Sequence, residues 1–181
     1  MKQWKSEGSG EINRRLLGSC GDNVIFEDGV RIFHPENVHL GDNVYIGHNT
    51  ILKGYYKHEL RIGSHSWIGP GCFLHGAGGL YIGEYSGIGP AVRIHGATHI
   101  EGEEPEAPMV FAPLTFTSIQ IEENCNIGIG ATILGGVTIG AHSRIGAGAV
   151  VSRTVPAYSV AVGIPAKVIR HRNQGTADTM K

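Results

Sequence analysis

The chain has 181 residues, 41% of them hydrophobic, so its length and composition allow one domain built around one core. Its 15 Lys and Arg residues nearly balance 16 Asp and Glu residues, which gives no electrostatic reason to expect nucleic acid or an anionic membrane as a partner. The polar residues 1–10 lack the apolar core of a signal peptide and no apolar stretch is long enough for a membrane span, so we expect a cytoplasmic protein.

An aliphatic residue recurs every six positions along most of the chain. The pattern begins weakly at Cys20, Phe26 and Ile32 and is clearest over 121–155, where a small residue also follows four places after each aliphatic residue. A helix does not explain this period, because six residues drift around a 3.6-residue turn. Short strands do, since positions i and i+4 of an extended chain face the same side. Three such strands joined by three corners make an 18-residue coil that can stack on the next coil.

In chain order the hexads make six coils. These span residues 20–37, 40–57, 62–79, 82–99, 121–138 and 139–156. All four interruptions of the period follow the third strand of a coil, which places them along one edge of a prism. The sequence therefore predicts an all-β fold: a parallel β-helix over 20–162 with a protruding loop inserted at 101–120, an N-terminal extension over 1–19 and a C-terminal segment over 163–181.

Three histidines lie near the largest interruption. Alternation along an extended chain places Thr98 and Ile100 inside the prism, so His99 is expected to point outward at the root of the inserted loop. His75 and His95 occupy the same position in the third strands of adjacent coils. Their side chains are therefore expected to be neighbours on one outer surface.

The run Gly-Ile-Pro-Ala-Lys-Val-Ile-Arg follows the last coil, at 163–170. With the hexads, this ending resembles the hexapeptide-repeat acyltransferases, in particular the galactoside, maltose and xenobiotic O-acetyltransferases, over about residues 20–172. The resemblance implies a left-handed winding, which periodicity alone does not supply. It also implies an enzyme that uses acetyl-CoA as co-substrate, needs no metal, and works as a homotrimer with active sites between its subunits.

The same resemblance assigns roles to the histidines. It makes His99 the general base that takes a proton from a hydroxyl or amine of the acceptor as that group attacks the thioester of acetyl-CoA. An imidazole is mostly neutral yet basic near pH 7, which suits this task. His75, His95 and Glu101, the first residue of the acidic loop, are expected to bind the acceptor, and their polarity favours a sugar or nucleotide-sugar.

Residues for acetyl-CoA are also implied by the resemblance. They are Ile129, Ala147, Ser152, Arg153, Lys167 and Arg170. The backbone at the first two is expected to hold the pantetheine arm, and the basic side chains to face the phosphates. Asn126 departs from the pattern, because many relatives carry a Trp there.

Two alternative functions stay open on the sequence alone. The γ-type carbonic anhydrases share the β-helix and bind zinc through three histidines, and His75, His95 and His99 are the candidates for such a site here. Their spacing differs from that family's arrangement. A stack of coils can also serve as a rigid, non-catalytic scaffold for partner proteins.

Overall fold

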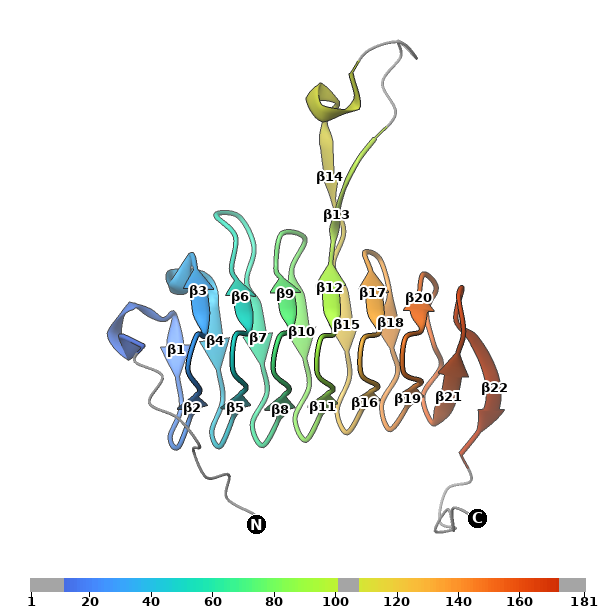
Figure 1. Ribbon diagram of the computed structural model, residues 1–181, viewed down its shortest axis with the longest axis horizontal. Coiled ribbons are helices and arrows are strands. Elements are labelled where there is room, and N and C mark those ends of the chain that lie inside the picture. The colour runs from blue at the N-terminus through green and yellow to red at the C-terminus, as the bar shows by residue number, and fades with distance from the viewer. Residues whose placement is uncertain (1–11, 101–107, 173–181) are drawn as a thin grey trace.

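The computed structural model describes residues 12–100 and 108–172, and three sheets of short parallel strands form the faces of a triangular prism (Figure 1). Sheet A contains β1 (Ser19–Cys20), β4 (Val38–Leu40), β7 (Leu60–Ile62), β10 (Leu80–Ile82), β15 (Ile119–Ile121) and β18 (Thr138–Ile139). Sheet B contains β2 (Ile25–Phe26), β5 (Tyr45–Ile46), β8 (Trp67–Ile68), β11 (Gly87–Ile88), β16 (Asn126–Ile127), β19 (Arg144–Ile145), β21 (Ser159–Val162) and the antiparallel β22 (Lys167–His171). Sheet C contains β3 (Arg31–Phe33), β6 (Ile51–Lys53), β9 (Phe73–His75), β12 (Arg93–His95), β17 (Thr132–Leu134) and β20 (Val150–Val151).

The strand register confirms the coils predicted from the hexads. Cys20 pairs with Leu40 in sheet A, and Ile82 pairs with Ile121 across the long insertion. A further, partial turn follows the six predicted coils, because Ala161 pairs with Ile145 in sheet B. The fold is thus the parallel β-helix that the hexads predict, with the left-handed winding that the resemblance implies.

The core is a set of aliphatic columns that run along the axis of the prism. Ile46, Ile68, Ile88 and Ile127 stack in sheet B, each no more than 1% exposed. Burying one such side chain stabilises the fold by about 1.5–3 kcal/mol, so the repeated hexad position supplies most of the driving force. Among the described residues, no helix is long and apolar enough to cross a membrane.

The corners explain most of the glycines. After the inward residue of sheet B the next position is Gly in five successive coils, at Gly47, Gly69, Gly89, Gly128 and Gly146. At Gly47 and Gly128 a Cβ would lie 2.5–2.6 Å from a backbone nitrogen of the next coil. Close stacking of the coils therefore excludes a side chain at these corners.

One hairpin leaves the prism between the fourth and fifth coils. Its strands β13 (Ala97–His99) and β14 (Leu114–Phe116) pair antiparallel and project beyond the other corner loops (Figure 1). The prediction that Thr98 and Ile100 point into the prism is wrong, because both are exposed. The fourth coil already closes at Gly96, whose carbonyl accepts from Thr117 N at 2.8 Å, so the residues after it pair within the hairpin instead.

Three short 3-10 turns lie outside the strands in the described part of the chain. Single 3-10 turns lie at η1 (Arg14–Leu16), before the first coil, and at η2 (Pro35–Asn37), between the first two coils. A third, η3 (Met109–Phe111), lies in the hairpin just before β14. Glu101, expected to bind the acceptor, lies outside the described residues.

Candidate active site

His99 is exposed on the hairpin and is held by one hydrogen bond. Its Nδ1 lies 2.7 Å from the carbonyl oxygen of Ala112, the residue that ends η3. A carbonyl oxygen can only accept, so Nδ1 carries the proton and donates it. In the tautomer with this proton on Nδ1 the lone pair lies on Nε2, where a general base would use it.

The root of the hairpin packs against a loop of the second coil. The ring centroid of Phe116 lies 5.3 Å from that of Tyr55 and 6.3 Å from that of His58. Phe116 pairs with Ala97 two residues before His99, so this aromatic contact is made at the point where the hairpin leaves the prism. It restricts how far the strand that carries His99 can tilt.

His75 and His95 are neighbours in sheet C, as the sequence predicts. They pair in register, and their ring centroids lie 4.7 Å apart with the planes 13° from parallel. His95 is exposed, but His75 is only 7% exposed, because Tyr55 covers its ring edge to face at 5.8 Å. No hydrogen-bond partner is found for either ring nitrogen of His75 among the described residues.

Burial controls the charge of His75. Loss of contact with water, together with the smaller effects of the neighbouring His95 and Lys53, lowers its pKa to about 4. The ring is therefore neutral at pH 7, with one N–H donor and one acceptor nitrogen unused. Both nitrogens are buried, so in this pair the exposed His95 is the ring that a ligand can contact directly.

Two of the positions expected to hold acetyl-CoA share one corner. Ile129 and Ala147 are exposed in adjacent coils where sheet B turns into sheet C, and Gly148 N donates to Ile129 O at 2.8 Å. The C-terminal segment lies beside the next coil end, at the start of β20. Val150 N donates to Gly163 O at 3.0 Å, and Ala166 N donates to Val150 O at 2.8 Å.

The other four positions expected to hold acetyl-CoA lie near the C-terminal end of the chain. In β22, Lys167 pairs with Val162 and Arg170 with Val160, which sets both exposed side chains at the C-terminal end of the prism. Ser152 and Arg153 are also exposed, but they follow β20 and so lie at the opposite edge of sheet C. The six positions thus form two groups in one chain.

Within one chain His99 is not beside the corner at Ile129. The hairpin leaves from the edge between sheets C and A, and the corner lies between sheets B and C. At about 3.3 Å per residue, the five steps from Ile129 to Leu134 span roughly 15 Å across sheet C. His99 and the corner at Ile129 are therefore separated by the width of sheet C within one chain.

The three histidines of the zinc hypothesis do not converge in the chain. Among the described residues, no group of three or more His, Cys, Asp or Glu side chains is placed to hold a metal ion. His75 and His95 stack face to face, an arrangement that does not direct their nitrogens at one point.

Comparison with known proteins gives the family. Residues 118–153 match the family model for the bacterial transferase hexapeptide (six repeats). The chain is 36% identical to the Saccharomyces cerevisiae protein named "Putative acetyltransferase YJL218W" over 160 residues, 88% of this chain and 69% of that protein. It is 31% identical to the galactoside O-acetyltransferase of Escherichia coli, over 88% of this chain and 66% of that protein. The chain belongs to the hexapeptide-repeat acetyltransferases.

Solved structures share the fold. A mutant of AntD, an N-acyltransferase from Bacillus cereus in complex with dTDP and coenzyme A, superposes with a TM-score of 0.80 at 22% identity, over 93% of this chain and 92% of that chain. The hexapeptide-repeat acetyltransferase VCA0836 from Vibrio cholerae, in complex with acetyl coenzyme A, gives a TM-score of 0.66 at 22% identity, over 89% and 74%. The relatives are acyltransferases, and this chain carries the same left-handed β-helix.

Proposed function

We propose that the protein transfers the acetyl group of acetyl-CoA to a hydroxyl or amine of a sugar or nucleotide-sugar, with His99 as the general base. The hydrogen bond from His99 Nδ1 to Ala112 O carries this proposal. It selects the tautomer with a free Nε2, orients the ring, and stabilises the imidazolium that forms when Nε2 takes a proton.

The reaction needs no covalent enzyme intermediate. His99 Nε2 accepts the proton of the acceptor hydroxyl while its oxygen attacks the thioester carbonyl carbon. The tetrahedral intermediate then collapses, the carbon–sulfur bond breaks, and the CoA thiolate takes the proton from Nε2. The products are the acetyl ester and free CoA, and the imidazole is neutral again.

His75, His95 and Glu101 are the proposed acceptor-binding residues. The exposed His95 presents its ring nitrogens at the surface, and the buried, neutral His75 stacks directly against it. Donors and acceptors of this kind match the hydroxyls of a sugar. The proposal agrees with the relatives, which include a galactoside O-acetyltransferase and an AntD structure that holds dTDP-4-amino-4,6-dideoxyglucose and coenzyme A.

The proposed enzyme is a homotrimer. The separation between the His99 hairpin and the corner at Ile129 supports active sites between subunits. In this arrangement Ile129 and Ala147 of one subunit hold pantetheine, and Ser152, Arg153, Lys167 and Arg170 bind the phosphates of CoA. We expect the enzyme in the cytoplasm.

The test is release of CoA from acetyl-CoA with a panel of sugars and nucleotide-sugars, followed by His99→Asn. Asparagine keeps an N–H for Ala112 O but has no basic nitrogen, so we expect kcat to fall by about 10²–10⁴-fold. His34→Asn is the control, because this exposed histidine lies in the first coil and Asn tolerates its left-handed φ of 50°. An active His99→Asn enzyme would show that another group is the base.

A further inference from the structure

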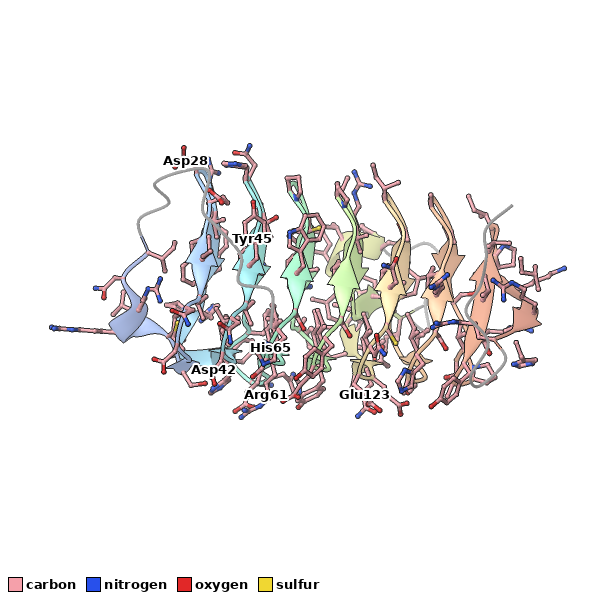
Figure 2. The ribbon with its side chains drawn as sticks, turned by 90° about the horizontal axis from the view of Figure 1, so that it is seen from below. Asp28, Asp42, Tyr45, Arg61, His65 and Glu123 are labelled. Carbon is pink, nitrogen blue, oxygen red and sulfur yellow. The ribbon has the colours of Figure 1, made fainter. Side chains whose placement is uncertain are left out.

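The outer face of sheet B contains a gap in an otherwise continuous row of side chains. Tyr45, Trp67, Gly87, Asn126 and Arg144 pair in successive coils and point outward, so Gly87 is a step without a side chain. Figure 2 looks onto this face, with Tyr45 on it and His65 at its lower edge.

Gly87 is not required by the backbone, which distinguishes it from the corner glycines. Its φ is not among the positive values, and a Cβ built on it meets a single heavy atom, Asn126 Nδ2, at 3.6 Å. At Gly128, by contrast, a Cβ would lie 2.5 Å from Ala147 N. A side chain would therefore fit at position 87, and the glycine leaves that space open.

The space is a pocket with an aromatic wall. Its volume is about 280 Å³. Trp67 forms the side nearer the N-terminus, and its other face stacks on Tyr45 with centroids 5.8 Å apart and planes 5° from parallel. Because the row continues along the axis of the prism, the open face of Trp67 is directed at the gap over Gly87. A ligand ring placed there continues the aromatic stack.

The opposite side of the pocket is positively charged. Arg144 and Arg172 line it, and Asn126 adds an amide. One Nη of Arg172 donates to His142 O, and its backbone N to Tyr158 O, so the guanidinium is anchored while its other N–H groups can serve a ligand. None of the described residues that line the pocket is Asp or Glu; Glu84 and Glu123 lie outside it.

We propose that this pocket binds a small ring-bearing anion. Its ring stacks on Trp67 over Gly87, and its phosphate or carboxylate lies between Arg144 and Arg172, since planar guanidinium groups bind both anions well. The volume suits one sugar or nucleoside with a single anionic group. The site lies on the outer face of sheet B, across the prism from the edge where the His99 hairpin leaves and beside the corner at Ile129, which follows β16.

Tryptophan fluorescence tests the proposal. Trp4→Phe leaves Trp67 as the single tryptophan, and saturating CoA keeps nucleotides out of the CoA site. The probes are uridine monophosphate, glucose 1-phosphate and glucuronate, with uridine, glucose and inorganic phosphate as comparisons. We expect at least one ring-bearing anion to quench Trp67 saturably, and to bind at least about tenfold more tightly than its uncharged ring or phosphate alone. The anion that binds distinguishes a nucleotide from an acidic sugar.

Two variants separate binding from folding. Gly87→Val fills the gap and Arg172→Gln removes one charge, and each is expected to weaken binding at least about tenfold. Gly87→Val should keep the melting temperature and the rate of acetyl transfer, because position 87 touches neither His99 nor the corner at Ile129. The proposal is overturned if no ring-bearing anion quenches Trp67, if inorganic phosphate binds as tightly, or if Gly87→Val binds like the parent protein.

Discussion

The buried, neutral His75 makes the fold sensitive to acid in a way that one substitution removes. Burial lowers its pKa to about 4 in the folded protein, against 6.5 for the unperturbed side chain. Between these values the unfolded chain binds a proton that the folded protein does not, so the free energy of unfolding falls as the pH falls through this window. At 1.36 kcal/mol per pKa unit, the loss from this group is about 2 kcal/mol between pH 7 and pH 5 and about 3 kcal/mol by pH 4.

His75→Phe tests this reasoning. A Phe ring keeps the planar shape beside Phe73, whose centroid lies 5.7 Å from that of His75, but cannot take a proton. We expect urea unfolding at fixed protein concentration to show that the parent protein loses about 2 kcal/mol more than the variant between pH 7 and pH 5. Other titrating groups are common to both proteins and cancel. Parallel pH curves for His75→Phe and the parent would refute a buried, neutral His75.

Three further predictions concern the corners, the hairpin and the shared site. Gly128→Ala forces a Cβ to within 2.5 Å of Ala147 N and should lower the free energy of unfolding, measured by urea titration, by about 2 kcal/mol or more. Gly87→Ala is the control and should change it by less than about 0.5 kcal/mol. Equal effects of the two substitutions would contradict the corner geometry. Phe116→Leu removes the ring contact with Tyr55, so we expect kcat to fall while the melting temperature changes little. An unchanged kcat would contradict this prediction. Co-expressed His99→Asn and Lys167→Glu chains, each inactive alone, should regain up to about a quarter of the parent activity if each site uses two subunits, and none if each site lies within one chain.

The hexads predict the prism well because each inward position depends only on its own strand and its neighbours above and below. Ile82 and Ile121 illustrate this: they are separated by the long insertion, yet they pair in register. The direction of Thr98 and Ile100 could not be predicted in the same way. Alternation is identical in a prism strand and a hairpin strand, and the pairing of Thr98 with Thr115 decides which one forms.

The environment of the candidate site depends on contacts between distant segments. That His75 and His95 are neighbours follows from the repeat, but the burial of His75 requires Tyr55 from the loop of another coil. The partner of His99 is a carbonyl at Ala112, in a segment without any repeat. Gly87 looks like every other glycine of the sequence, and only the space above it shows that it differs.

A structure of the protein with CoA and an acceptor sugar bound tests the central claim most directly. We expect His99 Nε2 of one subunit within hydrogen-bond reach of the acceptor hydroxyl, with the CoA sulfur nearby and the pantetheine arm along Ile129 and Ala147 of a second subunit. A complex in which His99 Nε2 points away from both ligands, or in which CoA binds at another surface, would contradict the account.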